Sequence, residues 1–217
     1  MPVTQQDYLD AANVLQDGDV VDPRANRQGN AIVIDQVLQW TLEGRVYNTS
    51  NLVQEAGELA GESAFNLANP SFNLDVPPGL TCIPLEFHVR HEGTTGNAGD
   101  WVAMLLVADD IQTYSSGGQA ITPLNMRTHG PPSRARFFTG GVQIVNSPTN
   151  HQDDLLFMSF YDTSLHPNIS HIWTYKRNPM PVLVGPASLS YYIDVANIDH
   201  EIDFAFKWAE FPTRDLL

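Results

Sequence analysis

The sequence predicts an all-β protein that follows a polar N-terminal arm: an antiparallel β-sandwich, or a barrel, of about eight to ten strands. Residues Ile202–Trp208 alternate apolar and polar side chains with a period of two, which is typical of a half-buried strand. Similar short segments recur from about residue 70 onward, separated by loops rich in Gly, Pro and Asn, and no helices alternate with them. A length of 217 residues with 42% hydrophobic residues suits one such domain.

The N-terminal part, residues 1–30, is rich in Asp, Gln and Asn and is expected to be an acidic arm. The spacing of apolar residues within it favours a short helix over Gln5–Leu15, with Thr4 at the N-cap position. We expect the sandwich domain to occupy residues 31–217.

The first strands lie on either side of a less regular segment. One strand is expected at Ala31–Leu42, continuing after a kink as Gly44–Thr49. Weak helical spacing in Asn51–Phe65 predicts a short helical excursion, or an irregular one, between strands. Phe72–Val76 is a short strand that ends at 77–79 (PPG), where proline fixes φ and glycine permits a turn.

The later strands follow in close succession, with glycine-rich loops at Glu92–Asp100 and Ser115–Gly118. Over Trp101–Ala108 nearly every residue is apolar, so both faces of that strand should be buried. The predicted strands are Cys82–Glu92, Trp101–Ala108, Arg134–Val145, Asp154–Tyr161, Ser170–Tyr175, Ala187–Val195 and Ile202–Phe211. The side chains expected to face the core include Leu85, Phe87, Val89, Leu189, Tyr191, Ile193 and Val195.

The charge balance is acidic, with 11 Lys and Arg against 25 Asp and Glu and a net charge of -14. No basic residue precedes Arg24. Proteins that bind nucleic acid need clustered Lys and Arg to displace counterions from phosphate, so direct nucleic-acid binding is not expected. The charge suits solubility, a saline setting or divalent cations between subunits.

Cys82 is the only cysteine, and its place in a strand predicts a small buried hydrophobic residue. The polar N-terminus has neither the basic nor the apolar region of a secretory signal peptide. No apolar run approaches the ~20 residues of a membrane span, so no transmembrane segment is expected.

The best enzyme-like candidate is the pair His88 and His91, just before the glycine-rich loop. Metalloenzymes of the cupin type place two histidines two residues apart, on one face of a strand. A spacing of three residues sends these two to opposite faces unless a bulge intervenes. The sequence also has no nucleophile elbow, P-loop or zinc-protease motif. We therefore do not expect an enzyme.

Two pairs of adjacent aspartates stand at strand ends: Asp109 with Asp110, and Asp153 with Asp154. Carboxylates at loop mouths could bind Ca²⁺, which takes several oxygen ligands. Solvated strand-end residues have the same appearance. These four residues are the candidates for cation binding, with Ca²⁺ at subunit interfaces as the expected cofactor if there is one.

Two further patterns concern basic and aromatic residues. Arg134 and Arg136 share one strand face in the predicted pairing, and an ion pair with an acidic neighbour is a better expectation than phosphate binding. Trp173 and Tyr175 could form a platform for a sugar, although core or interface packing is the usual role of strand aromatics.

Three segments carry a resemblance to a known family. They are residues 76–89 (VPPGLTCIPLEFHV), 187–195 (ASLSYYIDV) and 202–212 (IDFAFKWAEFP). With the polar arm, they resemble the single jelly-roll capsid proteins of small icosahedral viruses and phages. In that family a proline-glycine turn precedes a long core strand, and the last strand closes the domain. The resemblance covers residues 30–212 and lies in architecture, without a diagnostic motif.

The resemblance implies a structural coat protein that self-assembles into an icosahedral shell. Its partners would be other copies of itself and, where the shell has one, a second coat or vertex protein. It would be made in the host cytoplasm and reside in the virion. The family often carries a basic N-terminal arm that binds the genome, whereas the arm here is acidic. Packaging would then depend on another protein, or the shell would enclose a membrane.

The subunit contacts of such a shell would come from long loops. The candidate loops are Gly93–Asp100, Thr113–Gly118, Thr128–Ser133 and Thr163–Asn168. The alternative function is a binding module built on the same fold: a trimeric ligand, a viral spike or a carbohydrate-binding domain.

Overall fold

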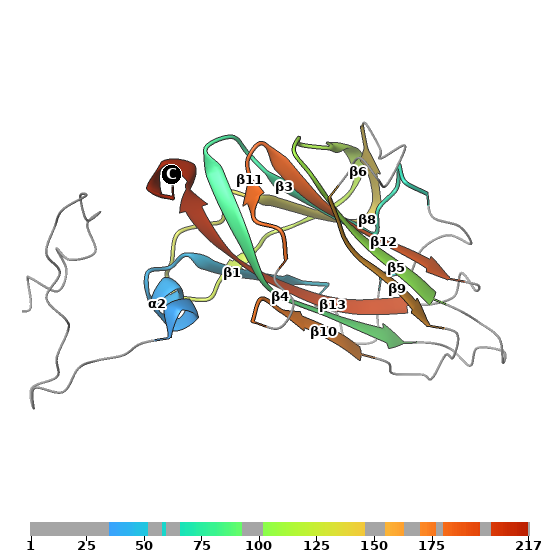
Figure 1. Ribbon diagram of the computed structural model, residues 1–217, viewed down its shortest axis with the longest axis horizontal. Helices are drawn as coiled ribbons and strands as arrows, with labels where there is room; N and C mark the ends of the chain where they lie inside the picture. The colour runs from blue at the N-terminus through green and yellow to red at the C-terminus, as the bar shows by residue number, and fades with distance from the viewer. Residues whose placement is uncertain are drawn as a thin grey trace, which may run out of the picture. The chain divides into compact units, whose positions relative to one another are not determined.

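The structure is a computed structural model, and it describes residues 35–51, 58–59, 66–92, 102–145, 155–162, 170–176, 180–195 and 201–216 (Figure 1). The chain divides into two compact units, Met1–Gln39 and Trp40–Leu217. The predicted arm at residues 1–30, with its helix at Gln5–Leu15, lies outside the described residues. A domain boundary at residue 30 therefore stays a prediction.

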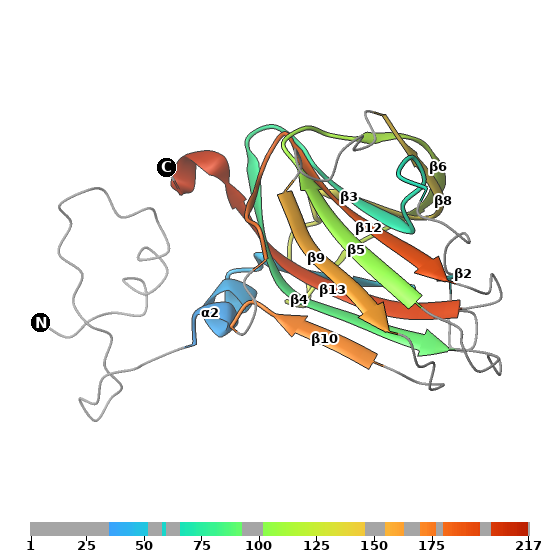
Figure 2. The same cartoon turned by 45° about the vertical axis from the view of Figure 1, so that its right-hand side comes forward.

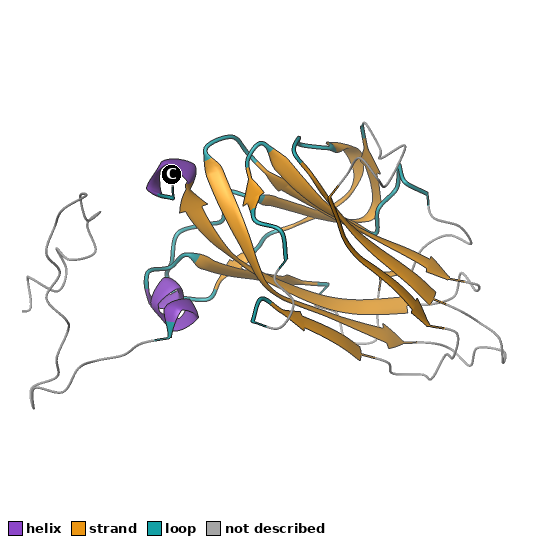
Figure 3. Cartoon of the chain, in the orientation of Figure 1, coloured by secondary structure: helices purple, strands orange, loops and turns teal. Residues whose placement is uncertain are grey.

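The second unit contains all the strands of the described chain, and helical segments are short (Figure 3). The helical segments are α2 (Gln36–Leu42) and η1 (Thr213–Asp215). The strands are β1 (Val46–Ser50), β2 (Glu58–Leu59), β3 (Phe72–Val76), β4 (Leu80–Glu92), β5 (Val102–Asp109), β6 (Tyr114–Ile121), β7 (Leu124–Asn125), β8 (Arg136–Ile144), β9 (Leu155–Asp162), β10 (Ser170–Thr174), β11 (Leu183–Val184), β12 (Ala187–Val195) and β13 (Glu201–Pro212).

These strands form two antiparallel sheets that pack face to face (Figure 1). One sheet has seven strands in the order β10-β4-β13-β1-β7, with β11 on β4 and β2 on β13. The other has six strands in the order β6-β8-β3-β12-β5-β9. The predicted all-β antiparallel sandwich is confirmed.

The strand order within the sandwich is that of a jelly roll. Four strands of one sheet, β1-β13-β4-β10, face four strands of the other, β3-β12-β5-β9. Following these eight strands along the chain, every connection passes to the opposite sheet except the one from β5 to β9. This wrapping gives the jelly-roll arrangement of two interlocked Greek keys.

The connection from β5 to β9 carries an insertion that extends both sheets. Strands β6 and β8 form a ladder that continues the six-stranded sheet beyond β3. The short strand β7 pairs with β1 and so borders the seven-stranded sheet. The insertion therefore covers the two jelly-roll edges on one side, β1 and β3.

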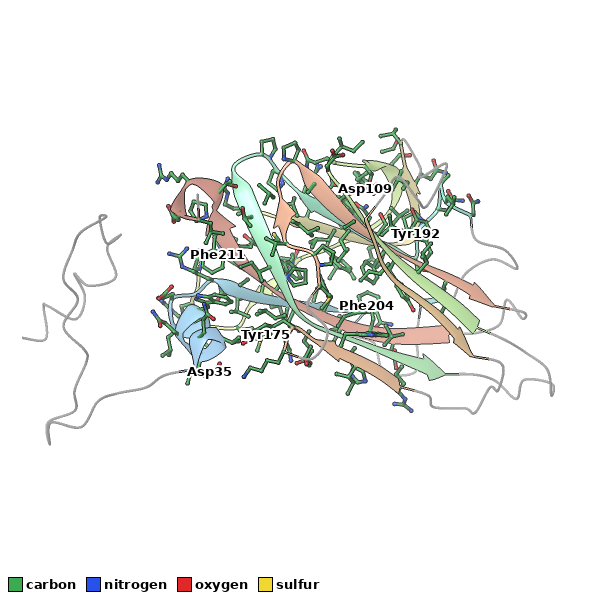
Figure 4. All side chains as sticks on the ribbon, viewed as in Figure 1. Asp35, Asp109, Tyr175, Tyr192, Phe204 and Phe211 are labelled. Atoms are coloured by element: carbon green, nitrogen blue, oxygen red, sulfur yellow. The ribbon has the colours of Figure 1, made fainter. Side chains whose placement is uncertain are left out.

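An aromatic cluster fills the space between the sheets. Phe72, on β3 of the six-stranded sheet, is fully buried, and its ring centroid lies 5.4 Å from those of Phe87 and Phe204 on the opposite sheet. Phe204 lies among these core side chains in Figure 4. Other aromatic members of this main core are Tyr47, Phe137, Trp173, Tyr191, Phe206 and Trp208. Such rings contribute both buried area and specific edge or stacked contacts.

The period-two predictions hold where the structure describes the side chains. In β13, Phe204, Phe206 and Trp208 are buried in the main core, and the residues between them are partly exposed. β3 and β12 have the predicted bounds. In β5 both faces are buried over residues 105–108, as the continuous apolar run predicted.

The strand predicted at Ala31–Leu42 is wrong over residues 36–42, which form helix α2. Asp35 caps this helix, because its Oδ1 accepts hydrogen bonds from the N–H groups of Val37 (3.0 Å) and Leu38 (3.3 Å). The helix ends in a Schellman motif, with Gly44 at φ +74° and a bond from Arg45 N to the Trp40 carbonyl (2.9 Å). These caps outweigh a composition that also suits a strand.

The loop predicted at Ser115–Gly118 is also wrong, because these residues belong to β6. Gly117 and Gly118 have positive φ, and the register with β8 shifts between Tyr114 and Ser116 and again between Gly117 and Gln119. A Cβ at Gly117 would lie 2.4 Å from the Gly141 carbonyl oxygen, so the bulged strand requires glycine there. Within the predicted excursion Asn51–Phe65, the described residues 58–59 form strand β2 on β13 and no helix.

We predict that Phe72→Ala lowers the free energy of unfolding by about 3–5 kcal/mol, because it opens a cavity at the centre of the aromatic cluster. Phe72→Leu, which keeps most of the volume, should cost clearly less. Urea unfolding followed by tryptophan fluorescence measures both. A loss below about 1 kcal/mol for the alanine variant would contradict a central role for this ring.

We predict opposite effects for two neighbouring tyrosines. The Tyr191 hydroxyl is buried and has no hydrogen-bond partner among the described residues, so Tyr191→Phe should raise the free energy of unfolding by about 1 kcal/mol. The Tyr192 hydroxyl donates to the Leu67 carbonyl at 3.0 Å, so Tyr192→Phe should lower it by about 1 kcal/mol. Equal effects of the two substitutions in urea unfolding would refute this assignment.

Candidate functional site

The outer face of the six-stranded sheet is covered by the chain itself. A second apolar cluster on this face contains Leu105, Val107, Phe138, Val142, Ile144 and Tyr192, with Leu67 and Tyr114 packed against it. The segment that includes Leu67 is held by hydrogen bonds from Tyr192 Oη to the Leu67 carbonyl (3.0 Å) and from Ile144 N to the Ala68 carbonyl (2.9 Å). Over β5, β8 and β12 this face is therefore closed by intrachain packing.

A buried polar network lies on the same outer face. Asn73 Nδ2 donates to Thr113 Oγ1 at 3.0 Å and to Ser190 Oγ at 2.9 Å. Thr113 Oγ1 and Ser188 Oγ are 2.8 Å apart. All four side chains belong to fully buried residues, so these bonds replace the water that the groups lose on folding. The network joins β3 and β12 to the segment between β5 and β6.

Asp75 extends this network to a surface arginine. Its side chain is fully buried, and its Oδ2 accepts a hydrogen bond from an Arg136 guanidinium nitrogen at 2.7 Å. Burial raises the pKa of the Asp75 carboxyl, and the bonds from Tyr114 N and Arg136 offset part of that increase. The ion pair predicted for Arg136 is confirmed. Arg134 instead donates its backbone N–H to Glu210 Oε2 at 2.9 Å.

The outer face of the seven-stranded sheet is polar and partly exposed. The strand register aligns Asn48, Lys207, Glu86 and Thr174 in one row across four strands. Lys207 Nζ lies 3.0 Å from Glu86 Oε1, and each of these side chains is about one third exposed. An ion pair this exposed adds little stability, so this row forms a polar surface and contributes little to holding the strands together.

The next row on that face contains Ser50, Ala205, His88 and Ile172. His88 Nε2 and, in the row beside it, Asn48 Oδ1 are buried atoms without hydrogen-bond partners among the described residues. Ile172 is 60% exposed. The face thus combines an exposed apolar side chain with polar atoms whose hydrogen bonds are not made within the described chain.

The structure places half of the predicted cation-binding residues. Asp109 ends β5, and its Oδ2 accepts a hydrogen bond from Ser188 Oγ at 3.4 Å (Figure 4). Asp110 follows it in an exposed bend. Asp153 and Asp154 lie outside the described residues. Among the described residues, no group of three or more His, Cys, Asp and Glu side chains could hold a metal ion. Cation binding by these aspartates stays a prediction.

The histidine pair lies on a regular part of β4. His88 is opposite Ala205 and His91 opposite Ile202, and the register does not shift between Glu86 and Glu92. The register shift in this ladder falls nearer the start of β4, where Leu85 is skipped between Pro84 and Glu86. No bulge therefore brings the two histidines to one face.

The core packing expected of strand aromatics is confirmed for Trp173, and the alternative of a sugar platform is wrong for it. This residue is buried in the main core, with its ring stacked on Phe87 at 5.4 Å between centroids. β10 turns Trp173 toward the opposite sheet, so it cannot form an exposed surface with Tyr175. The loop predicted at Thr113–Gly118 is wrong, because Thr113 is fully buried and the rest is part of β6, and a subunit contact by these residues stays a prediction.

Glu210 is a buried acid that the sequence analysis overlooked. It follows Phe206 and Trp208 with the same period of two, and this phase was the available signal that it faces the core. Its carboxylate accepts hydrogen bonds from Ser133 Oγ (2.5 Å), Trp208 Nε1 (2.9 Å) and Arg134 N (2.9 Å). These bonds hold the segment before β8 against the end of β13.

Cys82, predicted to be a buried hydrophobic residue, is fully buried in the main core. Burial raises the pKa of its thiol well above the usual range, and the negative charge of Glu210 raises it further. Both effects disfavour the thiolate, which is the reactive form of a cysteine.

Comparisons of the chain with protein-family models, with curated proteins and with solved structures found no match. Among the described residues, no helix is both long enough and apolar enough to span a membrane.

We predict that the free energy of unfolding of wild type, measured relative to that of Asp75→Asn, decreases as pH rises from about 4. Its raised pKa means that the folded protein keeps this proton to a higher pH than the unfolded chain does. Stability is therefore lost between the two pKa values and is constant above the folded-state value. Urea unfolding of wild type and Asp75→Asn at several pH values measures the difference, with Asp110→Asn as the exposed control. A difference that rises with pH would contradict this sign.

Proposed function

We propose that this protein is a structural capsid subunit whose copies assemble into a closed icosahedral shell. The observation that carries the proposal is the strand order, in which β1-β13-β4-β10 faces β3-β12-β5-β9. This is the arrangement implied by the resemblance to single jelly-roll capsid proteins. Because one fold can host many functions, strand order and resemblance support the proposal together, and an assembly experiment decides it.

The two outer faces also suit a subunit with distinct contact surfaces. The chain's own apolar cluster covers the outer face of the six-stranded sheet. The outer face of the seven-stranded sheet carries both signs of charge, including the Lys207–Glu86 pair. Closed shells are built from contacts between different patches of identical subunits, which a block with two unlike faces can supply.

The charge of the chain bears on what such a shell would hold. A net charge of -14 opposes direct contact with phosphate, and the first 23 residues contain no basic side chain. The proposed subunit therefore leaves genome binding to another component or encloses a membrane. Other copies of the chain, and a second coat or vertex protein where the shell has one, are its proposed partners in the virion.

We predict that the purified full-length chain forms uniform shells or capsomer rings in negative-stain electron microscopy. Assembly should be favoured at high salt, because salt screens the repulsion between subunits of charge -14. A monodisperse monomer at every protein and salt concentration would refute the proposal.

The same particles test the predicted Ca²⁺ contribution. If cations bridge carboxylates between subunits, a chelator at low salt should lower the particles' melting temperature, and added Ca²⁺ should restore it. An unchanged melting temperature would refute cation bridging between subunits without contradicting the shell proposal.

A further inference from the structure

The strand at one edge of the seven-stranded sheet lacks the features that usually protect an edge from pairing with another chain. β10 (Ser170–Thr174, sequence SHIWT) pairs with β4 and with no other strand of the described chain (Figure 2). It contains no Lys, Glu, Asp, Pro or Gly. Natural proteins protect free edges with charges, prolines, bulges or very short strands, because an open edge is a template for pairing.

The opposite side of the sandwich shows such protection. There the seven-stranded sheet ends in β7, which has two residues, and the six-stranded sheet ends in β6, whose ladder is broken by glycine bulges. On the side of β10, the six-stranded sheet ends in β9 (Figure 2). The insertion therefore ends the seven-stranded sheet in a very short strand on one side, whereas on the other side this sheet ends in β10, which has five residues and pairs with β4 without a register shift.

The backbone of β10 is oriented for pairing. Tyr175 N donates to the Leu85 carbonyl at 3.0 Å, and the register places Trp173 opposite Phe87. In an antiparallel ladder, every second residue forms its backbone hydrogen bonds with the same neighbouring strand. Trp173, two residues before Tyr175, therefore also bonds to β4 through its backbone. Ser170, Ile172 and Thr174 then direct their N–H and C=O groups toward the open edge. The exposed side chain of Ile172 stands at the middle of these three.

We propose that β10 pairs in antiparallel fashion with β10 of a second copy of the chain, across a two-fold axis at Ile172. Side chains alternate between the two faces of a sheet, so the outer faces of the two copies become continuous only if each even-numbered residue lies opposite an even-numbered residue of the second copy. A two-fold axis at Ile172 meets this condition and pairs all five residues of β10. Ile172 then meets Ile172 of the second copy, and Ser170 meets Thr174 of the second copy. The three outward residues of each copy supply the hydrogen bonds, as in β-strand addition.

The charges on the outer face are complementary across this junction. The register places Lys207 and Glu86 in the row of Thr174, and Asp203 and Arg90 in the row of Ser170. Two-fold pairing joins these rows, so the continuous row alternates basic, acidic, basic and acidic residues. Three strand spacings of about 4.8 Å separate Glu86 from Arg90 of the second copy, and their long side chains shorten that gap. This separation exceeds the Debye length of about 8 Å at physiological salt, so the charge match adds little attraction, but it places no like charges next to each other across the junction.

This pairing does not depend on the proposed shell. It joins the seven-stranded sheets of two copies into one sheet and is isologous, because each copy contributes the same strand. A shell requires additional contacts beyond this one. The pairing and the shell can therefore be tested separately.

The first test introduces a charged side chain on β10 of the full-length protein, because a charge on an edge strand opposes pairing with another copy. Ile172→Lys puts like charges opposite each other at the two-fold axis, and we expect it to weaken dimerisation roughly tenfold or more in analytical ultracentrifugation. Leu124→Lys is the matched control, because Leu124 is 58% exposed on β7 at the opposite edge. Melting temperatures check that both variants fold. A monomeric wild type, or equal behaviour of the two variants, would overturn the proposal.

The second test detects the same contact by cysteine cross-linking within dimers or larger particles. Residues directly opposite in such a pair have Cα atoms about 5.5 Å apart, so a short bismaleimide should join two copies of Ile172→Cys. Leu124→Cys should give no such product, and the native Cys82 is fully buried. Equal cross-linking of both variants refutes β10 pairing.

The combined outcomes separate the two proposals. Particles that form without the Ile172→Cys cross-link refute the β10 contact and leave the shell intact. Cross-linked dimers that never form particles refute the shell and leave the β10 contact intact.

Discussion

The contact between Phe72 and the rings of the opposite sheet is the interaction on which the rest of the structure depends. The Phe72 ring touches Phe87 and Phe204 across the sandwich, and Tyr191 within its own sheet at 5.1 Å. Most jelly-roll connections pass from one sheet to the other, so each sheet is built from strands that alternate along the chain with those of the other. Packing at this centre is therefore what makes the two halves of the chain one cooperative unit.

The insertion between β5 and β9 gives the sandwich its asymmetry. It contributes Tyr114 and Phe138 to a second apolar cluster, and these rings stack with centroids 3.6 Å apart. Covering that face buries Asp75 and the hydroxyl network. The hydroxyl groups bond to one another and to Asn73, and the Asp75 carboxylate accepts hydrogen bonds from Tyr114 N and Arg136. The same insertion ends in short or bulged strands. The seven-stranded sheet thus ends in the two-residue strand β7 on one side and in the longer strand β10 on the other.

Period-two alternation predicted much of the fold, because a strand with one buried face records that face directly in the sequence. β3 and β12 were predicted with their bounds, and Phe204, Phe206 and Trp208 were correctly assigned to the core face of β13. Prediction failed where local geometry decides the structure. Helix α2 depends on the Asp35 cap and the turn at Gly44, and β6 depends on glycine bulges that resemble a loop in sequence.

The candidate surfaces were harder to predict because they depend on which strands are neighbours. The sequence placed Asp109 at a strand end, but its partner Ser188 lies 79 residues away and is reached only through the pairing of β5 with β12. Trp173 and Ile172 are adjacent in sequence, yet one fills the core and the other is 60% exposed. Nothing in the five residues of β10 marks them as an edge. They become one because β4 has β13 on its other side and the chain supplies no further described strand beyond β10. The property that would matter most for assembly is therefore set by topology, and local sequence pattern can supply only the composition of that edge.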